Sequence, residues 1–185
     1  GMSKSTWMVR AGEGGAFVDD FITKGVIGVW FLPLDLGDPS TIVSRDFVIN
    51  AFRAAHPDWK DGRVVTAAGQ LYRFLAELTV GDEIVTVDPN RRIYYLGTIE
   101  SPASRIAESG DGPSYHRKVR WESQVMRDAL TVESRNTLAS TLTLFRIGPE
   151  VAADLRGRAH PLGKPLEPVV VPEDAKVAEA ISIEQ

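Results

Sequence analysis

The feature that most constrains the fold is a change of hydrophobic period near Gly81. Before it, residues 66–78 repeat with the period of a helix and place their large apolar side chains on one stripe. After it, residues 83–87 and 92–99 are rich in β-branched and aromatic residues, and they flank the turn-forming sequence Asp-Pro-Asn-Arg at residues 88–91. The chain therefore combines helices with a β-hairpin, which argues against a doubly wound parallel sheet.

Shorter patterns predict the remaining elements. Apolar runs typical of strands occur at residues 7–10, 26–31, 115–121 and 142–147. A helical pattern occurs at residues 16–24. A second helix can be capped by Ser40 or Ser44 and must end before Pro57. A single helical turn is expected near residues 127–130. Because strands dominate the second half, we predict an α+β fold built on a curled mixed sheet or small β-barrel flanked by helices.

The composition changes after Ile147. Gly148-Pro149 interrupts the pattern, and four more prolines follow between residues 161 and 172 with few large apolar residues. Such a composition is typical of a linker. We therefore expect a folded body at residues 6–147, followed at residues 148–185 by a Pro-rich linker and a short C-terminal helix.

Composition also excludes several classes of protein. The chain has no cysteine, which excludes disulfides, thiolate-ligated zinc and a cysteine nucleophile. No apolar run approaches the ~20 residues that cross a bilayer, and the first residues resemble no export signal, so we expect a cytoplasmic protein without a membrane partner. The net charge of -4 argues against non-specific coating of nucleic acid but leaves a local basic site open.

Motifs for catalysis and for cofactors are weak. The sequence Gly-Glu-Gly-Gly at residues 12–15 would let backbone amides approach a phosphate, but Phe17 replaces the third glycine of a dinucleotide-binding motif. The histidines show no metal-ligand spacing. Asp58-Trp59-Lys60 has a nuclease-like spacing with Asp46 upstream, yet the two aspartates are expected in a loop and on a helix rather than on paired strands. We therefore predict no catalytic residue, metal or cofactor.

Aromatic and basic residues are concentrated at residues 115–121, where three permanent cations lie beside two aromatic side chains. Strand alternation would place Tyr115, Arg117 and Trp121 on one face. Such a face can stack a base and hold a phosphate. The alternative is a solvated strand whose Arg117 and Lys118 form surface ion pairs, and spacing alone does not choose between the two.

An ordered series of motifs runs through residues 6–147. The motifs are WMVRAGEGG at 7–15, GVIGVWF at 25–31, AAGQLYRF at 67–74, VGDEIVTVDPNRRIYYLGTI at 80–99, HRKVRW at 116–121 and NTLASTLTLFRI at 136–147. The series resembles the N-terminal, PUA-like domains of Mrr-like modification-dependent restriction endonucleases, which are similar in kind to EVE and YTH modules. The resemblance implies the targeting part of a restriction enzyme, with the nuclease in a domain that would follow the Pro-rich linker.

The resemblance also implies a mechanism. Readers of this kind accept a nucleobase flipped out of its strand, hold it between aromatic faces and test its edge with a few hydrogen bonds. The hypothesis calls for aromatic walls, an amide that reads the base edge, and cations that contact phosphates. The candidates are Trp30, Trp59 and Tyr115 for the walls, Gln70 for the edge, and Arg10, Arg117 and Lys118 for the phosphates.

Alternatives remain for individual residues and for the function. Instead of reading a base, Gln70 could cap a helix or tether a loop. Instead of contacting a phosphate, Arg10 could form an ion pair with Glu13 or Asp19. The predicted function is a DNA-binding targeting module that recognises a flipped modified base and has no catalytic activity of its own. The alternatives are an RNA-binding module of the same fold and a protein-interaction domain whose aromatic residues all belong to the core.

Overall fold

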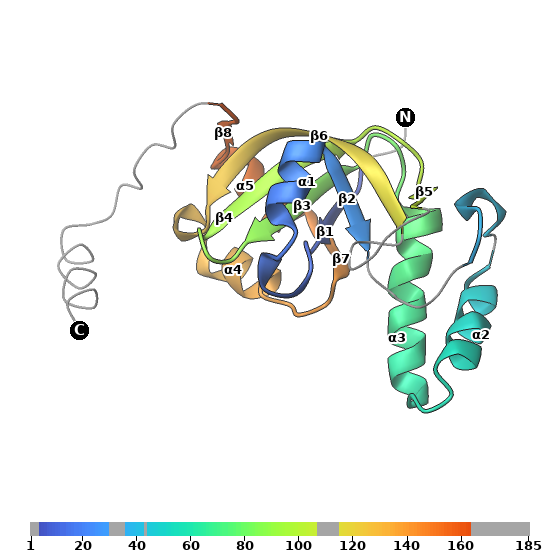
Figure 1. The fold of residues 1–185 in the computed structure, drawn as a ribbon. Coiled ribbons are helices and arrows are strands. Elements are labelled where there is room, and N and C mark those ends of the chain that lie inside the picture. Colours follow the sequence, from blue (N-terminus) through green and yellow to red (C-terminus); the bar gives the residue numbers. More distant parts are fainter. Residues whose placement is uncertain (1–3, 30–35, 43, 107–114, 164–185) are drawn as a thin grey trace.

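The strands form a strongly curled sheet that makes a half-barrel flanked by helices (Figure 1). The structure is a computed structural model, and it describes residues 4–29, 36–42, 44–106 and 115–163. The strands are β1 (Thr6–Val9), β2 (Val26–Val29), β3 (Glu83–Asp88), β4 (Ile93–Ile99), β5 (Ser104–Arg105), β6 (Tyr115–Met126), β7 (Leu144–Ile147) and β8 (His160–Pro161). The α-helices are α1 (Val18–Lys24), α2 (Arg45–Ala55), α3 (Asp61–Tyr72), α4 (Val132–Leu138) and α5 (Pro149–Gly157). The predicted α+β class, with a curled mixed sheet flanked by helices, is confirmed.

Short helical segments connect these elements. Three are 3-10 turns, η1 (Glu13–Gly15), η2 (Pro39–Thr41) and η4 (Arg127–Ala129), and the π-helical segment η3 (Arg73–Glu77) continues α3. The helix predicted at residues 66–78 therefore starts earlier, at Asp61, and ends in η3. The sequence missed α4, whose seven residues begin where the Thr131 side chain accepts a hydrogen bond from the N–H of Ser134.

The sheet order in the described residues is β2-β6-β4-β3-β1-β7, with β5 and β8 also paired to β6. β1 and β3 run parallel, and β3 and β4 form the predicted antiparallel hairpin. The hairpin turn closes because one carboxylate oxygen of Asp88 accepts hydrogen bonds from the N–H groups of Asn90 and Arg91, each at 3.0 Å.

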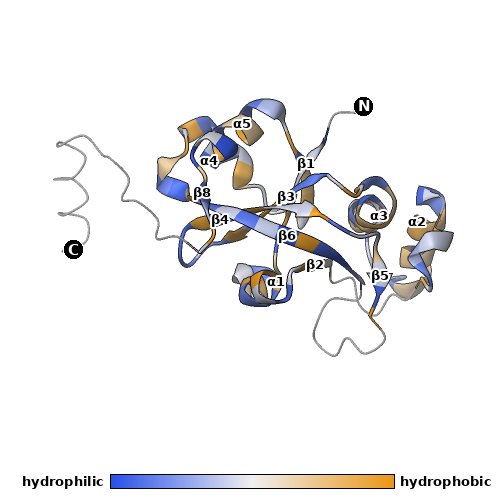
Figure 2. Ribbon diagram, turned by 90° about the horizontal axis from the view of Figure 1, so that it is seen from above, coloured by the Kyte–Doolittle hydropathy of each residue, from blue (hydrophilic) through white to orange (hydrophobic). Residues whose placement is uncertain are grey.

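Apolar side chains pack on both faces of the sheet. The larger cluster joins Phe21 of α1, Phe52 of α2 and Leu71 of α3 to the strands, and the smaller cluster contains Leu138 of α4 and Leu155 of α5. Figure 2 shows α4 and α5 on one side of the sheet and α1 on the other, with α2 and α3 at one end. We call α2, α3 and the turn between them the α2–α3 hairpin.

The folded part of the chain continues past Ile147, where the sequence predicted a linker. Pro149 takes the first helical position of α5, where the N–H that proline lacks would have no partner in the helix. Leu155 is fully buried, and β8 pairs with β6 through His160 and Gln124. Proline at this position starts a packed helix, so the predicted boundary lies inside the folded region. The predicted C-terminal helix lies outside the described residues.

Candidate functional site

A pocket of about 690 Å³ lies between three segments that are far apart in the sequence. They are residues 10–17 between β1 and α1, the β3–β4 turn with Val87 and Pro89, and residues 139–143 between α4 and β7. This volume falls in the range of about 300–1,000 Å³ that is typical of small-molecule sites. The pocket contains the glycine-rich sequence singled out above, and we take it as the candidate site.

Two glycines allow the pocket walls to approach one another. Gly12 and Gly15 have φ values of 76° and 74°, a left-handed conformation that side chains disfavour. A Cβ atom on Gly12 would lie 2.6 Å from Cδ2 of Phe17, and one on Gly15 would lie 2.6 Å from Cδ of Pro89. The β3–β4 turn and the Phe17 ring can therefore close on this loop only because both positions are glycine.

Hydrogen bonds fix the three segments against the sheet. The N–H of Phe17 donates to the carbonyl of Ala11 at 2.8 Å, and the N–H of Arg10 donates to the carbonyl of Thr143 at 2.8 Å. The hydroxyl of Thr86 in β3 donates to the carbonyl of Val9 at 2.7 Å. The pocket is thus held by neighbouring strands rather than by loops alone, which suits a preformed binding site.

Arg10 is the one predicted site residue that lines this pocket among the described residues. Its guanidinium donates from Nε to the carbonyl of Ser140 at 2.9 Å and from Nη2 to the carbonyl of Leu138 at 2.9 Å. Burial lowers the pKa of Arg10 from its ordinary value, although nearby Tyr94 opposes this effect. Arg10 therefore positions the end of α4 and the residues after it, and within the described residues it forms no ion pair with Glu13 or Asp19. Its Nη1 forms no hydrogen bond there, and the phosphate contact that the sequence suggested stays a prediction.

Arg117 is buried, with 4% of its surface exposed. Its Nη1 donates to the carbonyls of Phe74 and Leu78 at 2.8 Å and 2.7 Å, and its Nε donates to the carbonyl of Ser101 at 3.2 Å. Burial lowers the pKa of Arg117 to about 10, while the charge of Asp82 opposes the shift. The predicted phosphate contact does not fit this position, because the cation faces carbonyls at the end of η3 instead of solvent.

Tyr115 and Arg117 lie on the same face of β6, as the alternation predicted, and this face points into the core. Tyr115 is 1% exposed, and its hydroxyl accepts from the N–H of Leu36 at 2.9 Å and donates to the carbonyl of Gly37 at 3.3 Å. Trp121 donates from its indole N–H to the carbonyl of Phe21 at 2.8 Å. Tyr115 is therefore packed inside the protein and does not form the open wall that the sequence suggested.

Gln70 ties α3 to the sheet. Its side-chain oxygen accepts a hydrogen bond from the N–H of Leu144 at 2.9 Å, and its side-chain nitrogen donates to the carbonyl of Thr66 at 3.4 Å. Leu144 belongs to β7, the last strand in the sheet order, so Gln70 supplies an acceptor that no further strand provides. This is the tethering role that the sequence left open, and it uses the amide that was predicted to read a base.

Replacing Gln70 by leucine should lower the free energy of unfolding by about 1–3 kcal/mol, because it leaves the buried N–H of Leu144 without an acceptor. Urea unfolding of the variant measures this loss. Asn50→Leu, which removes an exposed amide from α2, is the matched control and should change stability by no more than about 0.5 kcal/mol. A Gln70→Leu protein as stable as the wild type would refute the tethering role.

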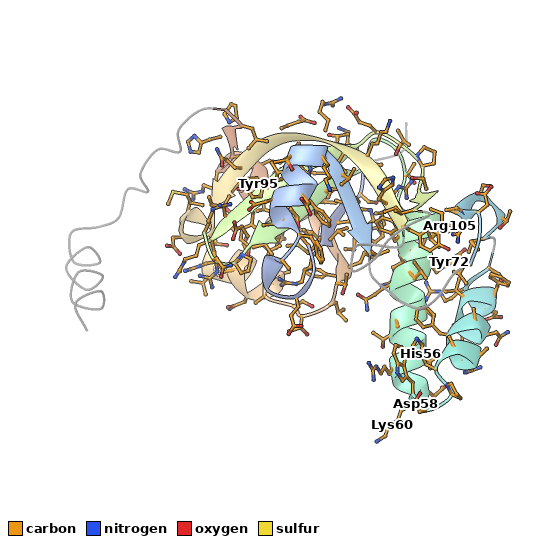
Figure 3. All side chains as sticks on the ribbon, in the orientation of Figure 1. His56, Asp58, Lys60, Tyr72, Tyr95 and Arg105 are labelled. Atoms are coloured by element: carbon orange, nitrogen blue, oxygen red, sulfur yellow. The ribbon has the colours of Figure 1, made fainter. Side chains whose placement is uncertain are left out.

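Trp59 lies at the tip of the α2–α3 hairpin, between the labelled Asp58 and Lys60 (Figure 3). Its ring stacks on His56 with a centroid distance of 3.8 Å and an interplanar angle of 7°, and the guanidinium carbon of Arg63 lies 3.9 Å from the ring centroid. These partners come from the hairpin itself, and Trp59 is not among the residues that line the pocket. The structure therefore does not bring Trp59 to a shared site with Arg10, Gln70 or Tyr115.

Two predicted residues remain. Lys118 is exposed, and its charge adds to burial in lowering the pKa of neighbouring His116. The β4–β6 register places Lys118 just beyond the Ile99–Val119 pair, at the opposite end of β4 from the turn that carries Pro89. Trp30 lies outside the described residues.

Sequence reasoning did not propose two further cations, Arg91 and Arg92, which belong to the β3–β4 turn but are not among the residues that line the pocket. Both are more than half exposed; Arg91 pairs with Asp19 at 2.9 Å and with Asp88 at 3.2 Å, and Arg92 pairs with Asp128 at 2.6 Å. The turn sequence predicts the hairpin but gives no sign that the turn borders a pocket. Its contact with Gly15 is the feature that makes it part of the pocket.

The nuclease-like motif does not assemble an acidic cluster. Asp58 and Lys60 are exposed at the tip of the α2–α3 hairpin, and Asp46 lies in the first turn of α2. Across the described ranges, no group of three or more histidine, cysteine or acidic residues is placed to hold a metal ion.

Comparisons of the chain with protein-family models, with curated proteins and with solved structures found no match. Among the helices of residues 4–29, 36–42, 44–106 and 115–163, none has the length and apolar character needed to cross a membrane.

Proposed function

We propose that this chain is a PUA-like, DNA-binding targeting module that takes up a flipped, modified base in the pocket between residues 10–17, the β3–β4 turn and residues 139–143. The observation that carries the proposal is the preformed pocket itself, with its volume of about 690 Å³. Its position differs from the site that the sequence suggested, because only Arg10 of the predicted residues lines it.

The lining suits a flat, partly polar group. Phe17 supplies an aromatic ring, Val87 and Pro89 supply apolar surface, and Thr141 and Thr143 supply hydroxyl groups. A base that leaves its stack costs a few kcal/mol, and contact with apolar and aromatic surface offsets part of that cost. A methyl group on the base adds only ~0.8 kcal/mol of burial, so we expect modest discrimination between modified and unmodified bases.

The cations of the β3–β4 turn supply phosphate contacts under this proposal. Pro89 lines the pocket, and Arg91 and Arg92 follow it in the same turn, where both side chains are more than half exposed. The pairs of Arg91 with Asp19 and of Arg92 with Asp128 are exposed and contribute only about 0–1 kcal/mol each, so a phosphate can replace these carboxylates at small cost. Binding should therefore weaken as salt increases.

Titration of a labelled duplex with a modified base, its unmodified counterpart and a matched RNA, each at two salt concentrations, tests the function. We expect the modified duplex to bind most tightly at both concentrations. Preference for the RNA would favour the RNA-binding alternative, and no binding to any of the three would favour a protein-interaction domain.

A variant that fills the pocket tests its location. Ala139 lines the pocket and is exposed, so Ala139→Trp adds bulk there without disturbing the core. We expect it to weaken binding of the modified duplex at least about tenfold, which corresponds to about 1.4 kcal/mol. Ala54→Trp, on the exposed side of α2, makes the same change outside the pocket and should leave the affinity within about twofold. Equal affinities for the two variants would rule the pocket out as the binding site.

A further inference from the structure

Four polar groups of the pocket are available to a ligand, since none of them forms a hydrogen bond within the described part of the chain. They are the Nη1 of Arg10, the carboxylate of Glu13 and the hydroxyls of Thr141 and Thr143. The guanidinium nitrogen donates hydrogen bonds, the ionised carboxylate accepts them, and each hydroxyl does both. The pocket therefore suits a ligand whose own groups also donate and accept.

Arg10 holds two sides of the pocket together while its Nη1 stays available. Its Nε and Nη2 donate to the carbonyls of Ser140 and Leu138, each at 2.9 Å, and its backbone N–H donates to the carbonyl of Thr143 at 2.8 Å. Glu13 lies in the loop that follows Arg10, which the β3–β4 turn contacts. The backbone that carries the donor and the acceptor is therefore in place before a ligand arrives.

Apolar surface lies beside these polar groups. The ring of Phe17 lines the pocket together with Val87 and Pro89. The face of an aromatic ring is negative, so it attracts weakly positive C–H groups. A sugar ring carries C–H bonds on its faces and hydroxyls around its edge, so it matches both the apolar and the polar part of this lining.

The pocket is also larger than a methylated base. At ~30 Å³ for each, its volume of about 690 Å³ has room for roughly 20 non-hydrogen atoms, whereas cytosine has about eight and a methyl group adds one. A methylated base would therefore leave much of the pocket to water. A hexose linked to cytosine through a hydroxymethyl group adds roughly 13 atoms and brings the total close to the capacity of the pocket.

We infer that the modification this pocket reads is a hydroxyl-rich substituent, a sugar attached to the base; this inference rests on the proposed function. The sugar hydroxyls donate to Glu13 and accept from the Nη1 of Arg10, while C–H groups of the sugar pack on Phe17. The remaining volume does not suit the phosphates that flank the base, because the carboxylate of Glu13 repels them. A methyl group uses none of the polar groups, and a sugar uses them together.

Four duplexes that differ only at C5 of one central cytosine provide the test. C5 carries hydrogen, a methyl group, a hydroxymethyl group or a glucosylated hydroxymethyl group. We expect wild-type protein to bind the glucosylated duplex at least about tenfold more tightly than the methylated one. Methyl glucoside, a sugar without a base, is the competitor. If it binds as tightly as the glucosylated duplex, the pocket is a site for free sugars and the inference is overturned.

Glu13→Ala removes the acceptor without removing any side-chain hydrogen bond or ion pair that the described residues form. We expect it to lower the preference for the glucosylated over the unmodified duplex about fivefold. The ratio is the readout, because losing a negative charge raises the affinity for every duplex. Glu150→Ala, at the exposed start of α5, removes the same charge outside the pocket and should keep the ratio within about twofold.

The outcomes separate this inference from the function on which it rests. If the methylated and glucosylated duplexes bind equally while Ala139→Trp weakens both, the pocket is a base site and the inference of a sugar is refuted. A Glu13→Ala protein that keeps the wild-type ratio also overturns it. If none of the four duplexes binds, the proposed function itself fails.

Discussion

Replacing Arg117 by methionine should lower the free energy of unfolding by about 3 kcal/mol. The substitution keeps an unbranched side chain in the core but removes the donors for three carbonyls, those of Phe74, Leu78 and Ser101. Each buried acceptor left without a donor costs about 1–3 kcal/mol, and relief from burying the charge offsets part of the sum. Denaturant unfolding measures the loss, and for a chain of this size we expect the midpoint temperature to fall by about 6–12 °C.

The neighbouring arginine on the outer face of β6 is the matched control. Arg120 is 60% exposed and pairs with Glu100 and Glu122 at 2.9 Å and 3.2 Å. Arg120→Met should cost no more than about 1 kcal/mol, because exposed ion pairs contribute little. If the two variants were equally stable, the hydrogen bonds from Arg117 to the three buried carbonyls would not stabilise the fold as described above. A fall in nucleic-acid affinity for a fully folded Arg117→Met protein would restore its predicted phosphate contact.

Replacing Gly97 by alanine should also be severely destabilising, by about 2 kcal/mol or more. A Cβ atom at this position would lie 2.7 Å from the carbonyl oxygen of Arg120, 2.7 Å from Cγ1 of Val119 and 2.9 Å from Cε3 of Trp121. The register between β4 and β6 shifts between Leu96 and Gly97, so the backbone of β6 comes unusually close here. One of the three contacts is main chain in the middle of a sheet, which cannot move without breaking pairs on either side.

Replacing Gly62 by alanine should have the opposite effect and raise the stability of the protein. Gly62 lies in α3, has no neighbouring heavy atom within 4 Å of an added Cβ, and adopts no positive φ. Gly62→Ala should therefore stabilise the protein by up to about 1 kcal/mol, because alanine loses less conformational freedom on folding. Thermal unfolding of the two variants side by side checks the contrast. A Gly97→Ala protein that unfolds no earlier than the wild type would show that the β4–β6 approach is looser than described.

The sequence predicted helices and strands correctly where the apolar residues follow a single period, either that of a strand or that of a helix. The alternation at residues 83–99 predicted β3 and β4, and the helical stripe at residues 66–78 predicted most of α3. Alternation also placed Tyr115 and Arg117 on one face correctly. It could not tell which face is buried, because the carbonyls that satisfy Arg117 come from residues 16 to 43 positions away. A buried arginine and a solvated one look the same in sequence.

Proline chemistry explains the error after Ile147. A proline stops a helix in its interior but starts one at the first position, and the composition of residues 148–163 does not say which applies to Pro149. The burial of Ala152 and Leu155 settles that this segment packs on the sheet. The sequence missed α4 because this helix has no apolar stripe: its buried residues are Ser134 and Leu138, and Val132 is exposed.

The pocket could not be predicted because no single stretch of sequence contains it. Its walls come from residues 10–17, 87–89 and 139–143, and they meet through long-range contacts such as Gly15 with Pro89 and Arg10 with Ser140. The glycine-rich turn is the one local signal, and on its own it indicates no more than a tight turn or a weak phosphate loop. In the structure, Nε and Nη2 of Arg10 bind carbonyls of the protein beside this turn.

The central claim is that an extruded base enters this pocket, and chemical-shift mapping of the backbone amides tests it most directly. A titration of isotope-labelled protein with the duplex carrying a modified base should shift the amides of Gly12, Gly14, Gly15 and Thr143, which line the pocket. Shifts confined to the α2–α3 hairpin, or no shifts at these four amides when the duplex is saturating, would contradict the account.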